Sequence, residues 1–274
     1  MSVQFTDAPE TQNLAVPGLF SLKERVALVT GGAGRYGRMI CRALAEAGAT
    51  VIVASRNRTK CEEFAECLTR ESLDAHGLAL DLTQDESVQS VASRIESQWG
   101  KLDVLFNNAV SVRAKPLNEH SVEEWTRSIE CNGTALYRAC LVFGEMIVSR
   151  GAGSIVNVAS IYGVVSPDFR IYDGHREMTN PPSYGFVKAG MIQLTRYLAV
   201  YFGSRGLRVN SLSPGGLFSP GMPPEFVTNY SQRVPLGRMA NANDLKGAAI
   251  FLASDASAYV TGQNLVVDGG YTAL

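Results

Sequence analysis

The feature that most constrains the fold is a regular alternation of short apolar runs with longer segments of helical periodicity. The runs are VALVT, TVIVAS, LALDL, VLFNNA, SIVNVAS, RVNSLS and NLVVDGG, in order from residue 26 to residue 270. After the first run, the apolar residues Met39, Ile40, Ala43, Leu44 and Ala47 recur at helical spacing. Runs of Val, Ile and Leu without polar interruption indicate strands buried on both faces, and helical crossovers between them indicate parallel pairing.

The alternation therefore predicts an α/β fold of the Rossmann type, a doubly wound parallel sheet with helices on both faces. At 274 residues, with 46% hydrophobic and 19% charged residues, the chain has ample material for one large core. We expect an N-terminal arm over residues 1–20 and a single domain over residues 21–274. Ligands of such folds bind at the carboxyl ends of the strands.

Composition excludes several other classes of protein. The formal charge of −1 results from 25 Lys and Arg against 26 Asp and Glu, with no basic run that would favour nucleic acid as a partner. Five cysteines without a paired or CxxC spacing are typical of free thiols in a reducing compartment, and no residue cluster has the spacing of metal ligands. No secretory leader and no apolar run of membrane-spanning length is present, so we expect a cytoplasmic protein that does not associate with membranes.

The stretch TGGAGRYG, residues 30–37, follows the first predicted strand and begins the first predicted helix. Glycines here let the backbone approach a pyrophosphate, whose charge is stabilised by the free N–H groups of a helix N-terminus. Gly31, Gly34 and Gly37 fit TGxxGxxG, a spacing associated with nucleotide-sugar epimerases. The stretch predicts dinucleotide binding but leaves the reaction open.

The end of the second predicted strand bears on the choice of cofactor. No Asp or Glu occurs between Val51 and Lys60, where an NAD-specific fold would place an acid on the ribose hydroxyls. Ser55 and Arg56 stand there instead, and a guanidinium can pair with a 2′-phosphate. This favours NADP over NAD, with Arg56 as its ligand; the alternative is that Arg56 and Arg58 are solvated charges.

A second group at this end comes from the third predicted strand. Asp81 could reach the adenine while Leu82 packs on its ring, or Asp81 could simply cap the following helix.

Tyr184 and Lys188 are spaced i, i+4 in SYGFVKAG, which places both on one face of a helix. A phenol with a pKa of about 10 is a poor acid–base group at neutral pH. We expect the nearby ammonium to stabilise the phenolate and lower that pKa.

Tyr184 and Lys188 occur together with further motifs, namely NNA at 107–109, Asn132, Ser160, NSLSPGG at 210–216 and YVTGQNLVVDGG at 259–270. With this set of motifs the chain resembles the classical short-chain dehydrogenase/reductase family from about residue 22 onward. The resemblance implies a catalytic tetrad. In it Tyr184 donates or accepts the proton, Ser160 polarises the carbonyl, Lys188 binds the nicotinamide ribose and tunes Tyr184, and Asn132 orders a relay water. The residues that it and the glycine turn assign to the cofactor are Gly31, Gly34, Arg35, Tyr36, Gly37, Ser55, Arg56, Asp81, Leu82, Asn108, Pro214 and Gly215.

The chain departs from the family pattern at three places. Arg35 stands where the classical motif has glycine, Val110 replaces the last glycine of NNAG, and Ser160 and Tyr184 are further apart than usual. The classical VDGG ending leads us to interpret the glycine spacing as a local variation and Arg35 as added positive charge near the cofactor.

The polar stretch at 161–183 is interpreted as a substrate loop, and 215–238 as a Gly- and Pro-rich lid. Candidate substrate contacts are Tyr162, Asp168, Arg170, His175 and Phe218. The loop also offers Tyr172, Asp173 and Arg176 as hydrogen-bonding groups, and Met222 and Phe226 of the lid could line an apolar side of the pocket. The alternative for the loop charges is that they point to solvent or pair with a neighbouring subunit. The resulting hypothesis is reversible hydride transfer between NADP and a secondary alcohol or ketone of a sugar-like substrate. The loop, with SPDFRIY at 166–172, resembles that of a branch of the family active in sugar metabolism or surface-glycan synthesis.

Two alternatives remain at this point, an epimerase with internal hydride return and a non-catalytic dinucleotide sensor. The C-terminal segment is similar to one that the family uses to assemble, so the resemblance implies a homotetramer or homodimer.

Overall fold

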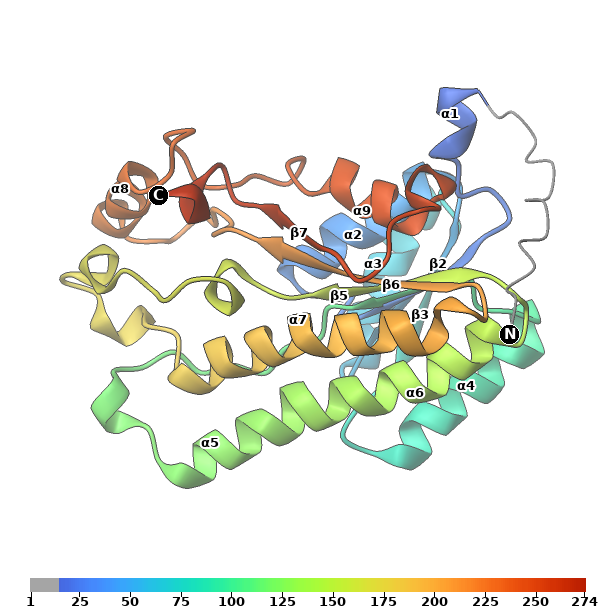
Figure 1. The fold of residues 1–274 in the computed structure, drawn as a ribbon, viewed down its shortest axis with the longest axis horizontal. Coiled ribbons are helices and arrows are strands. Elements are labelled where there is room, and N and C mark those ends of the chain that lie inside the picture. Colours follow the sequence, from blue (N-terminus) through green and yellow to red (C-terminus); the bar gives the residue numbers. More distant parts are fainter. Residues whose placement is uncertain (1–14) are drawn as a thin grey trace, which may run out of the picture.

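The computed structural model describes residues 15–274, so most of the arm predicted over residues 1–20 lies outside the described residues. What is described of it ends in a single helical turn, α1 (Val16–Leu19), which lies beside the 3-10 turn η6 (Asp255–Ser257). The rest of the chain alternates between strands and helices, as predicted (Figure 1).

A seven-stranded sheet in the order β3-β2-β1-β4-β5-β6-β7 forms the centre, and every neighbouring pair is parallel. This confirms the Rossmann-type doubly wound sheet. The strands are β1 (Val26–Thr30), β2 (Thr50–Ser55), β3 (Ala75–Ala79), β4 (Val104–Asn107), β5 (Gly153–Val158), β6 (Leu207–Pro214) and β7 (Asn264–Val267).

The third strand differs from its prediction. The apolar run LALDL suggested a strand over 78–82, whereas β3 begins at Ala75 and ends at Ala79. As an edge strand, β3 is buried only at Ala75 and Leu78 and exposed at His76 and Ala79, so an unbroken apolar run is not its signature.

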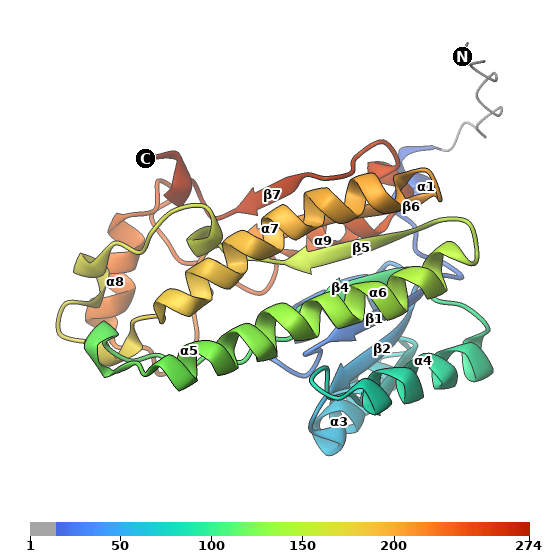
Figure 2. The ribbon, with the colours of Figure 1, turned by 60° about the horizontal axis from the view of Figure 1, so that its bottom comes forward.

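Helices cover both faces of the sheet (Figures 1 and 2). Buried residues of α4, α6 and α7 pack on one face, and those of α2, α3 and α9 on the other. The α-helices after α1 are α2 (Arg35–Glu46), α3 (Arg58–Arg70), α4 (Asp85–Trp99), α5 (Val122–Ile129), α6 (Ala135–Val148), α7 (Pro182–Gly203), α8 (Pro224–Gln232) and α9 (Lys246–Ala253).

Short turns complete the fold. A π-helical turn, η2 (Glu130–Thr134), joins α5 to α6. The 3-10 turns are η1 (Leu117–Glu119), η3 (Ile161–Gly163), η4 (Phe169–Tyr172), η5 (Arg176–Met178), η6 and η7 (Tyr271–Ala273).

The strand order reverses between β1 and β4, and this switch point is where an open α/β sheet leaves room for a ligand. In Figure 2 the arrowhead of β5 points toward the side of the molecule that carries α8. On that side a third cluster of buried side chains joins η3, η4, α8 and η7, which we call the aromatic cluster. Its buried members are Ile161, Tyr162, Ile171, Tyr172, Phe226, Tyr230, Val234, Met239 and Tyr271. The cluster closes the carboxyl edge of the sheet on one side.

Candidate functional site

A cavity of about 840 Å³ extends along the carboxyl edge of the sheet, across the switch point. Its glycine end is lined from segments 30–36, 54–60 and 80–83, and its loop end from segments 111–114, 161–180 and 217–239 together with residue 131. Between the two ends lie residues 108–110, 158–160, 184, 188 and 214–216. The cavity therefore brings together most of the predicted site residues.

The glycine turn is tied to β4 by one side chain. The Asn108 amide donates to the carbonyl oxygens of Thr30, at 3.1 Å, and Gly31, at 3.0 Å, while the Asn108 backbone N–H donates to the Thr30 hydroxyl at 3.1 Å. Gly31 has a φ of 62°, and a Cβ there would lie 2.8 Å from the Cα of Ala109. Only glycine fits so close a crossing of two chain segments.

The remaining residues of the turn differ in what they face. Gly34 precedes α2 as its N-cap, and Arg35 and Tyr36 at the start of that helix also line the cavity. The Tyr36 hydroxyl donates to the carbonyl oxygen of Gly215, which links the turn to the end of β6. Gly37 is absent from the lining; a Cβ there would lie 2.2 Å from the Gly31 oxygen, so it serves the packing of α2 on the turn.

At the far glycine end, Ser55, Arg56, Asp81 and Leu82 line the cavity as predicted. Arg58 does not; its guanidinium pairs with Glu62 one helical turn away, at 2.7 Å. Within residues 15–274 Arg56 has no such ion pair, so its charge faces the cavity.

Asp81 does not cap α4, since the N-cap of that helix is Gln84. Its carboxylate instead accepts hydrogen bonds from the backbone N–H and hydroxyl of Thr83, at 3.0 and 2.7 Å. Burial acts to raise the pKa of Asp81, but the Thr83 hydrogen bonds and the charge of Arg56 outweigh it and hold the pKa below its usual value. Asp81 is therefore ionised at neutral pH.

Ser160, Tyr184 and Lys188 meet in the middle of the cavity. Ser160 follows β5, while Tyr184 and Lys188 lie on one face of α7, with the Lys188 ammonium 5.7 Å from the centre of the Tyr184 ring. That ammonium donates to the carbonyl oxygen of Val158 at 2.6 Å. Burial lowers the Lys188 pKa to about 8.

The expected depression of the Tyr184 pKa is not observed. Burial of the phenol raises the pKa of Tyr184, and a hydrogen bond with Ser160 acts in the opposite direction without cancelling it. The sequence reasoning considered only the neighbouring ammonium and omitted desolvation, which is the larger effect here.

Asn132 lies in the π-helical turn η2, beside the cavity and outside its lining. Its side-chain oxygen accepts from the Ser111 N–H at 2.7 Å, and its amide donates to the carbonyl oxygens of Ser111, at 2.8 Å, and Ser128, at 2.9 Å. Since Ser111 lines the cavity, Asn132 fixes part of its wall. Single π-turns inside helices occur frequently at functional sites.

Pro214 and Gly215, at the end of β6, line the cavity opposite α2. The Gly215 N–H donates to the carbonyl oxygen of Val267 at 2.9 Å. A Cβ on Gly215 would lie 3.0 Å from the Cα of Asp268, so the residue suits this close approach of two strands.

Of the five predicted substrate contacts, Tyr162 lines the cavity and the other four lie outside its lining. Asp168 is held by Arg170 at 2.7 Å and by Arg233 at 2.9 Å, while Phe218 is half exposed. His175 lies near Glu177 and Glu225, at 3.6 and 3.8 Å. Asp173 and Arg176 are exposed, so part of the loop's charge faces solvent, which is one of the two alternatives for the loop.

The loop also contributes Tyr172 to the lining, as expected, together with three residues that sequence reasoning missed, Glu177, Met178 and Asn180. Met222 and Phe226, which the lid was expected to supply, line the cavity together with Tyr230 and Met239. Lys60 at the glycine end was also missed. It is the third residue of α3, so its place just after the end of β2, close in sequence to Arg56, was the signal that could have found it.

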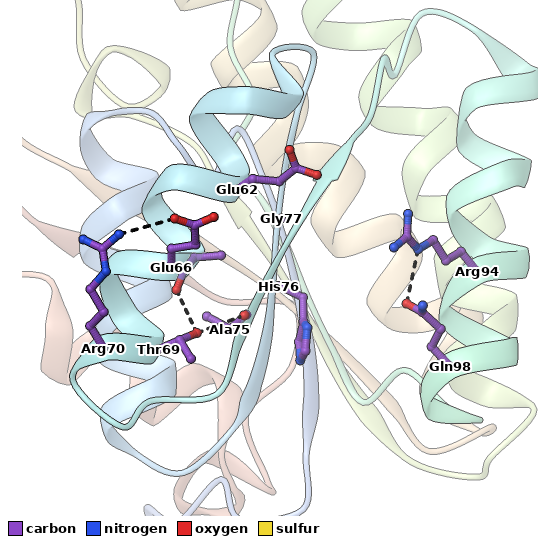
Figure 3. Close-up of a pocket in the computed structure, with 10 residues that line it drawn as sticks. Glu62, Glu66, Thr69, Arg70, Ala75, His76, Gly77, Arg94 and Gln98 are labelled. Atoms are coloured by element: carbon purple, nitrogen blue, oxygen red, sulfur yellow. Dashed lines mark hydrogen bonds and ion pairs between the residues drawn. The ribbon is translucent and has the colours of Figure 1, made fainter.

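A second hollow of about 720 Å³ lies on the surface beside the edge strand β3, between α3 and α4 (Figure 3). Its charged side chains pair locally, Arg70 with Glu66 at 3.4 Å and Arg94 with Gln98 at 3.2 Å. It contains none of the predicted site residues. Across residues 15–274 the structure has no helix suited to crossing a membrane and no His, Cys, Asp and Glu group suited to a metal ion.

Comparisons with known proteins agree with this geometry. A family model described as enoyl-(acyl carrier protein) reductase matches residues 35–272. The chain is 38% identical to cis-4-hydroxycyclohexanecarboxylate dehydrogenase of Sinomonas cyclohexanicum, over 92% of this chain and 98% of the relative. It is 32% identical to D-threitol dehydrogenase of Mycolicibacterium smegmatis, over 96% and 98%.

Among solved structures, a gluconate 5-dehydrogenase from Burkholderia cenocepacia in complex with NADP and tartrate superimposes with a TM-score of 0.86 at 29% identity. The match covers 95% of this chain and 100% of that one.

Replacing Lys188 with Met is expected to stabilise the fold at pH 7, because it removes a buried charge. Lowering the Lys188 pKa from 10.5 to about 8 corresponds to roughly 3.5 kcal/mol at most, at about 1.4 kcal/mol per pKa unit. Between pH 8 and pH 10.5 Lys188 is deprotonated in the folded protein but still protonated in the unfolded chain. The free energy of unfolding of the wild type therefore rises with pH over this range, and the stability advantage of the variant shrinks. Urea unfolding at pH 7 and pH 10 measures this, with exposed Lys23→Met as control. A variant less stable than wild type at pH 7 would contradict it.

Proposed function

The chain belongs to the short-chain dehydrogenase/reductase family, and we propose that it is an NADP-dependent oxidoreductase that interconverts a secondary alcohol and a ketone of a small sugar-like or cyclic substrate. The observation that carries the proposal is the meeting of Ser160, Tyr184 and Lys188 in a cavity whose other end holds the glycine turn. The dehydrogenases to which the chain is similar act on alcohols of this kind by name.

The glycine end fits the dinucleotide. Its turn is narrow enough that a Cβ on Gly31 would meet backbone, and Gly34 and Arg35 present a helix N-terminus to the cavity. When bound, the nicotinamide cofactor supplies or accepts the hydride. Pro214 and Gly215 border the middle of the cavity, where the nicotinamide end of the cofactor would lie beside Tyr184.

The preference for NADP rests on three cations. Arg35, Arg56 and Lys60 all line the glycine end, and no acid stands at the end of β2. A 2′-phosphate would lie closest to Arg56 and Lys60, at the start of α3. Asp81 and Leu82 would border the adenine, with Asp81 held in place by Thr83.

In ketone reduction, the Tyr184 hydroxyl donates the proton that the carbonyl oxygen takes up, and Ser160 hydrogen-bonds to the same oxygen. In alcohol oxidation, the Tyr184 phenolate accepts that proton. The Lys188 charge favours the phenolate and is positioned to hold the nicotinamide ribose. Asn132, fixed to the cavity wall through Ser111, is placed to order water that resupplies the proton.

Residues 21–274 act as one dehydrogenase domain in this proposal, with 161–183 as substrate loop and 215–238 as lid. Supporting this, η4 of the loop and α8 of the lid pack together in the aromatic cluster. The lid is joined to the site by the Gly216 N–H, which donates to the Tyr230 hydroxyl. Movement of the lid would therefore alter the wall of the loop end.

The enzyme is further proposed to be a cytoplasmic homodimer or homotetramer. Its five cysteines are free thiols, which suits a reducing compartment. Large apolar side chains stand exposed on the outer faces of α6 and α7, among them Tyr137, Tyr197 and Val200. A monomer in light scattering would contradict the self-association.

Replacing Tyr184 with Phe is expected to lower kcat by about 10²–10⁴-fold, because it removes the proton donor and acceptor. Burial raises the Tyr184 pKa, so wild-type ketone reduction should proceed at neutral pH and below, whereas alcohol oxidation should accelerate as the pH rises and the phenolate forms. Tyr197→Phe, on the exposed side of the same helix, is the control. Wild-type turnover by Tyr184→Phe would refute the mechanism.

Replacing Arg56 with Ala is expected to weaken NADPH binding by about 10- to 100-fold, the size of one charge-assisted contact, and to leave NADH binding unchanged. Lys60→Ala should act in the same direction, while Arg58→Ala, which removes a side chain paired with Glu62, should have little effect. Nicotinamide fluorescence titration gives the affinities. Equal losses for NADPH and NADH would show that Arg56 does not contact the 2′-phosphate.

A further inference from the structure

Charge is distributed unevenly along the cavity. All of its cations except the central Lys188 lie at the glycine end, in Arg35, Arg56 and Lys60. The lining of the loop end, among the described residues, holds a single charged side chain, the carboxylate of Glu177. A substrate there meets a negative charge and no free guanidinium or ammonium other than that of Lys188.

The cations near the loop end lie outside its lining. Arg113 and Arg176 are exposed and have no ion pair among the described residues, but neither lines the cavity. The others are already paired: Asp168 binds Arg170 at 2.7 Å and Arg233 at 2.9 Å, and Lys115, beside the loop, pairs with Glu124 at 2.6 Å. Recruiting one of the paired cations to a substrate carboxylate would first require breaking its ion pair.

Lys188 is not available for this purpose either. Its side chain is buried where α7 meets the end of β5, and its ammonium donates to the Val158 oxygen at 2.6 Å. It lies at the reacting centre, so an acid group elsewhere on the substrate would point away from it.

The walls of the loop end are mainly rings and thioethers. Tyr162, Tyr172 and Phe226 belong to the aromatic cluster, and Met178, Met222 and Met239 line the same end. The Tyr162 and Tyr172 hydroxyls bind each other at 2.8 Å, so one of their two O–H donors is already used. The other polar side chains of this end are few and include Ser111, Glu177 and Asn180.

From this arrangement, and resting on the function proposed above, we infer that the substrate is an uncharged secondary alcohol or ketone on a carbocyclic ring, and that Glu177 is a specificity-determining residue that selects against carboxylates. The apolar faces of such a ring pack against the aromatic and Met walls, while the reacting oxygen points toward Ser160 and Tyr184. An open-chain sugar acid would leave its hydroxyls without partners and its carboxylate facing Glu177.

The inference is tested by kcat/KM of the full-length enzyme with NADP+ and four alcohols: 1,4-cyclohexanediol, 4-hydroxycyclohexanecarboxylate, threitol and gluconate. The expected order places cyclohexanediol first, ahead of the ring acid by about tenfold or more, with gluconate last. Preference for gluconate or for the ring acid would overturn the inference and leave the proposed function intact. No turnover of any of the four, while NADPH still binds, would overturn both.

Glu177→Gln isolates the charge. It is expected to raise the ratio of kcat/KM for the ring acid to kcat/KM for cyclohexanediol by about two- to fivefold, the size of one exposed charge interaction. Asp173→Asn is the matched control, since it removes the same charge from an exposed position of the same loop outside the lining. If both substrates gained equally, or if Asp173→Asn gave the same gain, Glu177 would not determine specificity.

Discussion

The hydrogen bonds between Asn108 and the turn after β1 are the constraint on which the site depends. They join the carboxyl ends of β1 and β4, the two strands between which the sheet order reverses. Because the Gly31 turn is held against Ala109, α2 begins at a fixed place, and Arg35 and Tyr36 face the cavity. Tyr36 then reaches across to Gly215, so the turn also sets the position of the end of β6.

A second buried network fixes the helix that carries Tyr184 and Lys188. The Asn107 amide donates to Asn157 at 2.9 Å, the Asn157 amide donates to Thr195 at 2.9 Å, and the Thr195 hydroxyl donates to the Met191 oxygen at 2.8 Å. Strands β4 and β5 are thereby bonded to α7 inside the core. The Asn107 side-chain oxygen has no partner among the described residues, but each donor named here is paired, and any shift would leave a buried donor unpaired. The reacting groups thus stand on rigid elements, whereas the loop and the lid form the walls.

This division explains what the sequence could reveal. Strand–helix alternation and glycine spacing are local patterns, and they predicted the sheet, the turn and the residues at its edge. Side-chain direction in an irregular loop is not a local property. Asp168 and Arg170 looked like substrate ligands because they are polar, yet they satisfy each other and Arg233. The apolar Met178 and the ring of Tyr172 face inward, since η4 and η5 turn the chain between them. For the same reason the burial that dominates the Tyr184 pKa could not be derived from the spacing YxxxK.

The inward-facing residues also change how the polar loop bears on the substrate. A polar composition suggested a sugar, but only part of the loop lines the cavity. That part is mainly aromatic and apolar, with one carboxylate, Glu177, and one amide, Asn180. The two ends of the cavity are thus electrostatically opposite: cations gather where a phosphorylated dinucleotide would bind, and an anion stands where the substrate enters. Such a gradient steers the two ligands to different ends of one continuous cavity, because the cations at the glycine end attract a phosphate, whereas the Glu177 carboxylate at the loop end repels an acid.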